Sequence, residues 1–233
     1  MDVIKAIFFD FNGVIIDDER LQMAAYQEVL QVHGVELTEA QYFGALGMDD
    51  RTFVRTALER AGKFTLETAE AVHEAKRAAH RKMIEDELPL FPGVVTFLKA
   101  SARHFSLGLV SMADQSEISY VFDKARLREL FTVIVTADDV SVCKPDPTCY
   151  QRGLETLNQK RREARYLPLL PRECLVVEDS PPGIQSGKGA GMRTLGITNT
   201  VTEAELRAVG AEVVTASLAD WNADAVRHVF SQE

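Results

Sequence analysis

Residues 3–17 read Val-Ile-Lys-Ala-Ile-Phe-Phe-Asp-Phe-Asn-Gly-Val-Ile-Ile-Asp, and this stretch decides the fold. Its apolar, β-branched beginning predicts a buried strand over residues 3–11. The strand delivers the carboxylate of Asp10 towards its end, and the turn dipeptide Asn12-Gly13 follows. Proteins of the α/β class present catalytic groups in this way, at the carboxyl ends of parallel strands. The stretch therefore predicts the first strand of an α/β sheet and the first part of a functional site.

The composition is that of an ordinary globular protein. The chain has 233 residues, of which 46% are hydrophobic and 26% charged, enough for a large domain with a smaller module. The net charge of −9 argues against a nucleic-acid partner, because binding to a phosphate backbone needs a basic surface. An anionic substrate would therefore need a local positive site.

The sequence favours a cytoplasmic protein without membrane contact. No apolar run reaches the roughly 18 residues of a membrane helix, and Asp2 and Asp10 make the first apolar stretch unlike a signal peptide. Cys143, Cys149 and Cys174 are odd in number and form no Cys-x-x-Cys pair, which favours reduced thiols.

A helical module is predicted directly after the first strand. Apolar residues recur at helical spacing between residues 18 and 88, and the expected helices run from about 21 to 32, 38 to 46, 49 to 61 and 66 to 87. Basic side chains crowd the last of these helices, where we expect a solvated face: His73, Lys76, Arg77, His80, Arg81 and Lys82.

Beyond Pro92-Gly93, helical and strand patterns alternate. Helices are predicted at 93–103, 114–124, 147–165, 182–190, 202–208 and 218–230, and strands at 106–111, 133–136, 174–178, 194–197 and 212–215. Such alternation implies parallel strands with crossover helices. The expected fold class is therefore α/β. A Rossmann-like parallel sheet core comprises residues 1–17 and 89–233, with an inserted all-helical cap domain at residues 18–88.

Four predicted strand ends carry polar groups. In chain order these are Asp10 with Asn12, then Ser111, then Lys144 in Lys-Pro-Asp-Pro, and finally Glu178-Asp179-Ser180. In a doubly wound sheet all four converge at the carboxyl edge. Together they offer a nucleophile, an oxygen clamp, a counter-charge and a Mg²⁺ site, a set that suits phosphoryl transfer.

The same four groups resemble, in the same order, the motifs of the haloacid dehalogenase (HAD) superfamily. The matches are Asp10, Gly13, Val14 and Asp17 in the first motif, Ser111 in the second, Lys144 in the third and Glu178-Asp179-Ser180-Pro181-Pro182-Gly183-Ile184 in the fourth. The fourth motif closely resembles that of the phosphoglycolate phosphatase and β-phosphoglucomutase-like branch. Four motifs in the right order and strand context form a specific signal, whereas any one alone would be weak.

This resemblance implies the chemistry of the site. Asp10 would attack phosphorus and become an aspartyl phosphate. Mg²⁺ would be bound by Asp10, Asp179 and the main-chain carbonyl of Asn12, with Glu178 nearby or acting through water.

It also implies how the charges would be balanced. Lys144 would offset the crowded negative charge of the carboxylates and the phosphate. Ser111 and the amides of Met112 and Ala113 would hold phosphate oxygens.

Asn12 departs from the family pattern. Most phosphatases of the family carry Asp there, which protonates the leaving oxygen and later deprotonates the attacking water. A carboxamide cannot transfer that proton, and losing a positioned acid/base typically costs about 10²–10⁴-fold in rate. Three explanations stay open: a natural variant with weak or specialised activity, an engineered Asp-to-Asn trap, or a scaffold that binds a phosphorylated ligand without efficient turnover.

In the family the cap selects the substrate. The segment from Gly47 to Arg51 resembles a substrate-specificity loop, where Arg51 would suit a second anionic group. An exposed arginine at a helix start is an equally open alternative. Gln22 falls where mutase relatives carry a histidine near the hinge, which disfavours mutase activity.

The sequence thus predicts a Mg²⁺-dependent phosphomonoester hydrolase of the HAD superfamily. We expect it to act on a small phosphorylated metabolite as a monomer or weak dimer, without a nucleic-acid or membrane partner. A catalytically silent protein that binds a phosphorylated ligand on the same scaffold is the alternative.

Overall fold

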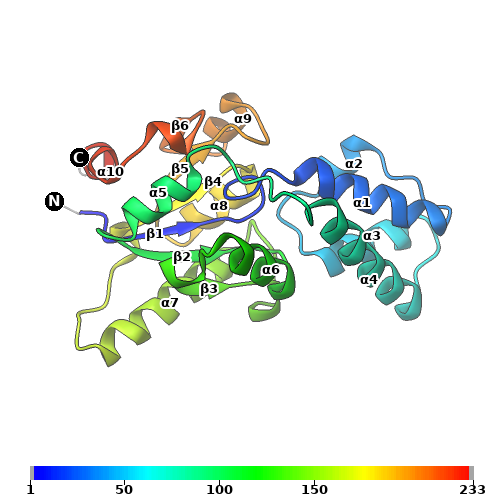
Figure 1. Ribbon diagram of the computed structural model, residues 1–233, viewed down its shortest axis with the longest axis horizontal. Coiled ribbons are helices and arrows are strands. Elements are labelled where there is room, and N and C mark those ends of the chain that lie inside the picture. Colours follow the sequence, from blue (N-terminus) through cyan, green and yellow to red (C-terminus); the bar gives the residue numbers. More distant parts are fainter. Residues whose placement is uncertain (1–2, 231–233) are drawn as a thin grey trace.

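Six parallel strands form one sheet at the centre of the computed structural model, which describes residues 3–230 (Figure 1). They are β1 (Ala6–Phe9), β2 (Ser106–Val110), β3 (Phe131–Val135), β4 (Cys174–Glu178), β5 (Arg193–Ile197) and β6 (Val213–Thr215). The order is β3-β2-β1-β4-β5-β6, and every neighbouring pair is parallel. The strand order reverses between β1 and β4. In open α/β sheets, ligands bind in the crevice at the carboxyl ends beside such a reversal.

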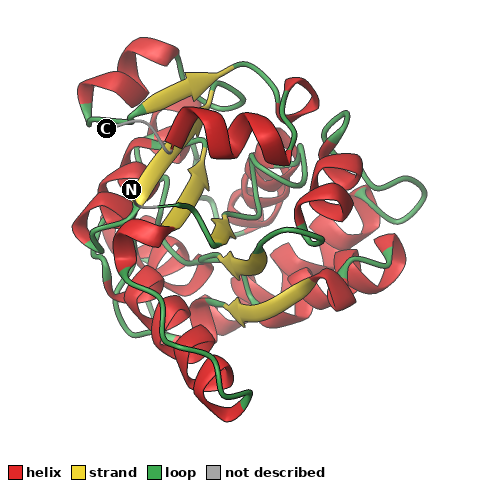
Figure 2. Ribbon diagram, turned by 90° about the vertical axis from the view of Figure 1, so that its left-hand side faces the viewer, coloured by secondary structure: helices red, strands yellow, loops and turns green. Residues whose placement is uncertain are grey.

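Helices cover both faces of this sheet (Figure 2). They are α5 (Val94–Ser101), α6 (Gln115–Ala125), α7 (Thr148–Glu163), α8 (Pro181–Gly189), α9 (Glu203–Ala208) and α10 (Ala223–Phe230). Along β1, Ile7 and Phe9 pack in one apolar cluster with residues of α5, α6 and α10. Ala6 and Phe8 point to the other face and pack with residues of α7. A central strand buried on both faces explains the unbroken apolar run at the start of the chain.

Four more helices form a separate lobe on the right of Figure 1, beside the carboxyl ends of the strands. They are α1 (Glu19–Val32), α2 (Glu39–Phe43), α3 (Asp50–Arg60) and α4 (Leu66–Met83). We refer to residues 19–83 as the lobe. It has an apolar cluster of its own, in which the rings of Tyr26 and Phe53 have centroids 4.4 Å apart.

Two adjacent chain segments join the lobe to the sheet. The amide of Asp17 donates to the carbonyl of Pro89 at 2.7 Å, and that of Phe91 donates to Ile15 at 3.2 Å. The entering and leaving segments therefore lie side by side. Hinges between domains occur at crossings of this kind.

The predicted α/β fold is confirmed, but several predicted elements have other ends. The strand expected at 3–11 spans only Ala6–Phe9, and the helix expected at 38–46 ends at Phe43. The helix expected at 218–230 begins only at Ala223, because the Asn222 side chain accepts the amide of Ala225 at 2.8 Å and caps it. The helix expected at 66–87 ends at Met83, since the next residue, Ile84, packs into the apolar cluster of the sheet. The core was predicted to begin at residue 1 and end at 233. Residues 1–2 and 231–233 lie outside the described part.

Across residues 3–230, no helix is long and apolar enough to cross a membrane. The three cysteines fall in the same range and carry free thiols, as their number predicts. Cys149 and Cys174 are buried, whereas the thiol of Cys143 donates to Asp49 of the lobe at 2.8 Å.

Candidate active site

The predicted polar groups come together at the carboxyl ends of β1, β2 and β4. Asp10 directly follows β1, Ser111 directly follows β2, and Asp179 directly follows β4. A cavity between the sheet and the lobe is lined from the sheet side by Asp10, Asn12, Ser111, Met112, Ala113, Lys144, Asp179 and Ser180. Glu178 lies behind this lining as the fully buried last residue of β4.

Lys144 is the central cation of the site. Its Nζ lies 3.0 Å from Oδ1 of Asp10 and 2.6 Å from Oε1 of Glu178, and it donates to the carbonyl of Val110 at 3.2 Å. Burial lowers the pKa of Lys144, but the charges of Asp10 and Glu178 outweigh this effect and raise that pKa above its usual value. The hydroxyl of Tyr150 donates to the same oxygen of Glu178 at 2.6 Å. Glu178 therefore holds the protonated Lys144 against Asp10.

Three carboxylates are arranged so that a divalent cation fits among them. Asp10, Glu178 and Asp179 each place one carboxylate oxygen within 4.8 Å of the others. Burial and the charges of Asp10 and Glu178 raise the pKa of Asp179 well above its usual range. Gly13 has φ +72°, and a Cβ there would collide with Oδ2 of Asp179, so only glycine lets the loop close over this carboxylate. Clustered carboxylate oxygens are the ligands that Mg²⁺ prefers.

The end of β2 faces the same cavity with polar groups. The side-chain oxygen of Ser111 accepts the amide of Ala113 at 3.1 Å, and Met112 lies between them. All three residues line the cavity. Their predicted contacts with phosphate oxygens stay a prediction.

Asn12 is held by a buried carboxylate that sequence reasoning missed. Its amide nitrogen donates to both side-chain oxygens of Asp18, each at 3.0 Å. Asp18 is fully buried and immediately precedes α1. An aspartate at position 12 would place two carboxylates in contact, so the surroundings are complementary to the amide. The acidic pair Asp18-Glu19, directly after the first motif, was the available signal.

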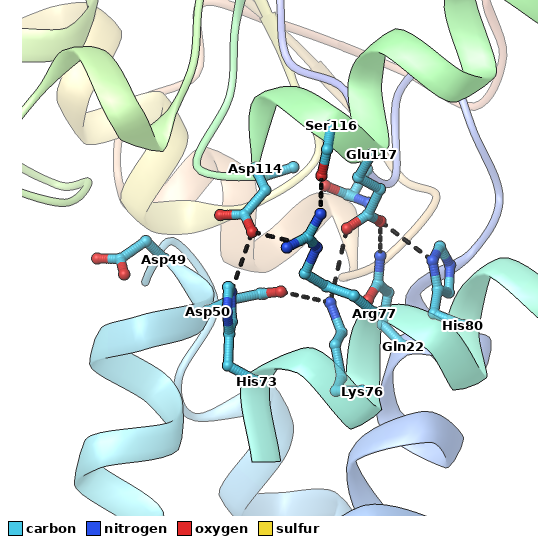
Figure 3. A network of polar contacts seen from close by, with 12 residues as sticks. Gln22, Asp49, Asp50, His73, Lys76, Arg77, His80, Asp114, Ser116 and Glu117 are labelled. Atoms are coloured by element: carbon cyan, nitrogen blue, oxygen red, sulfur yellow. Dashed lines mark hydrogen bonds and ion pairs between the residues drawn. The ribbon is translucent and has the colours of Figure 1, made fainter. Parts of the chain in front are cut away.

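Where α4 of the lobe meets the beginning of α6, charged side chains form a buried network (Figure 3). Nζ of Lys76 lies 2.6 Å from Asp50 and 3.6 Å from Glu117. His80 lies between two carboxylates, with Nε2 3.0 Å from Asp18 and Nδ1 3.2 Å from Glu117. The network therefore ties the lobe both to the sheet domain and to the segment that holds Asn12.

The expected solvated face of α4 was wrong for three of its six basic residues. His73, Lys76 and His80 are buried, whereas Arg81 and Lys82 are exposed as predicted. Nε2 of His73 lies 3.0 Å from Asp114, next to α6 (Figure 3). The carboxylates that balance these cations come from distant parts of the chain, so helical spacing alone could not reveal them.

Of the predicted lobe residues, Gly47 and Gln22 line the cavity and Arg51 does not. Gly47 has φ +86°, and a Cβ there would lie 2.9 Å from the side chain of Pro182, so this turn rests directly on the sheet domain. Gln22 donates to Asp18 at 3.1 Å and also donates to Glu117. Arg51 is exposed near the start of α3, so its role in binding a second anionic group stays a prediction.

Glu19 is a further cavity residue that sequence reasoning missed. It lies in the first turn of α1 and lines the cavity from the lobe side. The hydroxyl of Tyr42 donates to Oε2 of Glu19 at 2.6 Å. Burial, and then the charge of Asp18, raise the pKa of Glu19 to about 7.

Comparisons with known proteins agree with this architecture. The family model for haloacid dehalogenase-like hydrolases matches residues 4–191. A Bacillus subtilis protein, named provisionally as phosphatase YhcW, is 32% identical over 203 residues, covering 86% of each chain. The phosphorylated carbohydrates phosphatase of Thermotoga maritima is 29% identical over 203 residues, covering 85% of this chain and 88% of that protein.

A solved structure shows the same fold over nearly the whole chain. The β-phosphoglucomutase of Clostridium difficile superposes with a TM-score of 0.83 at 20% identity, covering 98% of this chain and 97% of the other. The chain belongs to the haloacid dehalogenase-like hydrolases. Within that family it is a phosphatase-type hydrolase.

The contacts of His80 predict a pH-dependent stability. Burial lowers the pKa of His80, but its hydrogen bond to Asp18 and the charge of Glu117 outweigh burial and raise that pKa. A raised folded-state pKa stabilises the protein fully below the unfolded-state pKa of about 6.5, and this contribution is lost as pH rises through the folded-state value. His80→Gln should therefore lower the free energy of unfolding by about 2 kcal/mol at low pH, and by progressively less at alkaline pH.

Urea unfolding of both proteins from pH 5.5 to 9 measures this difference. His104→Gln, at an exposed histidine of the sheet domain, is the matched control and should show no such trend. A His80→Gln effect that is constant over the whole pH range would contradict the ionic role.

Proposed function

We propose that this protein is a Mg²⁺-dependent phosphomonoesterase in which Asp10 is the nucleophile. The observation that carries the proposal is the setting of Asp10 beside Lys144 and Asp179, in a cavity closed by the lobe. The names of the two bacterial relatives support phosphatase activity. The alternative of a silent binding protein rests on Asn12 alone.

The residues present divide the work of phosphoryl transfer. Asp10 attacks phosphorus, while Lys144 keeps that carboxylate in place and offsets its charge. Ser111 and the amides of Met112 and Ala113 orient the phosphoryl oxygens. Asp10, Asp179 and the carbonyl of Asn12 would hold Mg²⁺, which supplies positive charge to the phosphoryl oxygens when bound.

We propose further that the lobe acts as a cap which opens to admit substrate. The cavity has a volume of about 80 Å³. Ligand pockets typically have volumes of about 300–1,000 Å³, so this space is small for a phosphorylated sugar. The paired segments at 15–17 and 89–91 would then be the hinge. Closure excludes water from the reacting groups, as lids of this kind do.

The lining of the cavity favours a monophosphate whose leaving group is neutral and hydroxylated. Lys144 is the only cation that lines it within the described residues, and Asp10 and Glu178 already pair with this lysine. From the lobe side, Glu19 and Gln22 face the space, and Oε1 of Gln22 finds no donor among residues 3–230. Acceptors of this kind bind hydroxyl groups and repel a second phosphate. The carbohydrate phosphatase among the relatives fits this class.

The first prediction from the proposed function concerns Asn12. Asn12→Asp should raise the turnover of an alkyl phosphate such as glycerol phosphate more than that of p-nitrophenyl phosphate, because only the alkoxide leaving group needs a proton from a positioned acid. Contact with Asp18 raises the pKa of the new carboxyl, which keeps it protonated enough to donate. Initial rates of phosphate release from both esters in the presence of Mg²⁺ measure the effect.

Two control variants accompany that experiment. Asn12→Ala removes the amide without adding a carboxyl and should give no gain, while Asp10→Asn should abolish turnover. If neither the wild type nor Asn12→Asp turns over phosphate esters and both still bind them, the protein is a silent phospho-ligand binder.

The second prediction concerns the metal. Asp179→Asn should weaken Mg²⁺ binding by more than about 10²-fold, beyond the cost of losing an outer-shell partner, because a charged ligand is lost. Isothermal titration of the protein with MgCl₂ measures the affinity. Asp220→Asn, at an exposed aspartate far along the chain, is the control. Unchanged affinity in Asp179→Asn would remove Asp179 from the ligand set.

The third prediction concerns the substrate. A sugar monophosphate should show a lower KM than the bisphosphate of the same sugar, because the second phosphate would meet carboxylates of the lobe. Arg51→Ala should leave both values unchanged, since this side chain is exposed outside the cavity. A preference for the bisphosphate that Arg51→Ala abolishes would instead establish Arg51 as the ligand of a second anionic group.

A further inference from the structure

The proposed reaction needs a proton donor that Asn12 cannot supply. A carboxamide does not give up a proton at neutral pH, and the amide nitrogen of Asn12 is engaged with both oxygens of Asp18 at 3.0 Å. An alkoxide is a poor leaving group without protonation. Another group on the cavity wall must therefore protonate the leaving oxygen if alkyl phosphates are substrates.

The carboxylates on the cavity wall are not equivalent. Within the described chain they are Asp10, Glu19, Asp50, Glu117 and Asp179. Cations hold three of them, since Asp10 pairs with Lys144 at 3.0 Å, Asp50 pairs with Lys76 at 2.6 Å, and Glu117 pairs with His80 at 3.2 Å. Asp179 accepts from Thr200 and belongs to the candidate metal site. These four carboxylates are therefore engaged by cations or by the candidate metal site.

Glu19 is the exception. Among residues 3–230, its hydrogen-bond partner is the hydroxyl of Tyr42, which donates to Oε2 at 2.6 Å, and no cation of that range lies within ion-pair distance. Oε1 of Glu19 has no hydrogen-bond donor in the same part of the chain, and the residue lines the cavity. One oxygen is thus held in place while the other is free to meet a ligand.

The position of Glu19 suits the stereochemistry of the reaction. In phosphoryl transfer the attacking and leaving oxygens lie roughly in line on opposite sides of phosphorus. Asp10 attacks from the sheet, so the leaving oxygen points to the lobe, from which Glu19 enters the cavity. The water that later cleaves the aspartyl phosphate arrives from the same side. One residue there can serve both steps.

The charges around Glu19 allow it to hold a proton near neutrality. Its pKa is raised to about 7, first by burial, then by Asp18 before α1 and also by Asp10 after β1, while Tyr42 on α2 and Lys76 on α4 oppose the rise. Asp179 after β4 faces it as well, since the charge of Glu19 acts on that carboxyl. A pKa near the working pH suits an acid that must also act as a base.

We propose that Glu19 is the general acid and base of this enzyme, in the role that residue 12 cannot fill. This inference rests on the proposed phosphatase function. Asp10 attacks phosphorus, the bond from phosphorus to the leaving oxygen breaks, and the proton of Glu19 passes to that oxygen to give an alcohol. The ionised Glu19 then takes a proton from water as this water attacks the aspartyl phosphate. Inorganic phosphate leaves, and both Asp10 and protonated Glu19 are restored.

Glu19→Gln tests the inference through the leaving group. Glutamine keeps the shape and can accept the Tyr42 hydrogen bond, but it cannot donate an acidic proton. For an alkyl ester such as glycerol phosphate, kcat/KM should fall by about 10²-fold or more. For p-nitrophenyl phosphate, whose phenolate leaves without protonation, the loss should be much smaller. Glu39→Gln, at an exposed glutamate of α2, is the matched control and should change neither.

Two further variants make the assignment specific. Asn12→Asp placed in the Glu19→Gln background should restore alkyl phosphate turnover, because a carboxylic acid returns to the cavity. Tyr42→Phe removes a hydrogen bond that stabilises ionised Glu19, so the alkaline limb of the pH profile should move to higher pH. This second test holds even if Glu19→Gln does not fold.

The outcomes separate this inference from the function on which it rests. If the wild type hydrolyses neither ester, the proposed phosphatase function fails and the role of Glu19 falls with it. If the wild type is active but Glu19→Gln lowers kcat/KM equally for both esters, Glu19 only binds the substrate or supports the cavity. The proposal would also be overturned if Tyr42→Phe did not shift the alkaline limb of the pH–rate profile.

Discussion

The structure depends on buried cations that hold carboxylates together at one edge of the sheet. Two like charges 4 Å apart repel by about 4 kcal/mol at an effective dielectric constant of 20. Lys144 offsets this repulsion between Asp10 and Glu178, and Lys76 does the same between Asp50 and Glu117. Removing one partner of such a buried pair typically costs about 3–5 kcal/mol, because a charge is left without compensation. The same contacts that assemble the site therefore fix the lobe against the sheet.

Asn12 fits this electrostatic arrangement better than an aspartate would. The carboxylate at this place in the fold comes from Asp18, which receives the Asn12 amide and also contacts His80. The contact gives the Asn12 amide two acceptor oxygens, which an aspartate at this position would leave without this donor.

The sequence predicted the sheet and its polar strand ends because both depend on local signals. An apolar run that ends in Asp10, and the motif around Glu178 and Asp179, are visible in the chain without knowledge of its packing. The structure brings Asp10, Lys144 and Asp179 to one cavity, as parallel strands require.

The contacts across the lobe were not predictable in the same way. Lys76 and His80 look like members of a solvated helix face, because their partners Asp50 and Glu117 lie elsewhere in the chain. Glu19 was missed for the same reason, since its environment is set by Tyr42 and by the closure of the lobe over the sheet. Ion pairs between distant parts of the chain produce no periodic pattern in the sequence.

The nucleophile and the candidate metal ligands lie on the sheet domain, whereas the proposed acid lies on the lobe. The proposed reaction therefore depends on closure of the lobe over the sheet. Asp10, Lys144 and Asp179 belong to the sheet domain, whereas Glu19 belongs to α1 of the lobe and would move with it. An acid on the lobe meets the leaving oxygen only when the lobe is closed and bulk water is excluded. An acid at position 12 would instead belong to the sheet domain and would be in place before closure. With the proton donor on the lobe, turnover would require a leaving group that allows the lobe to close. Closure of the lobe would then control both substrate selection and proton transfer.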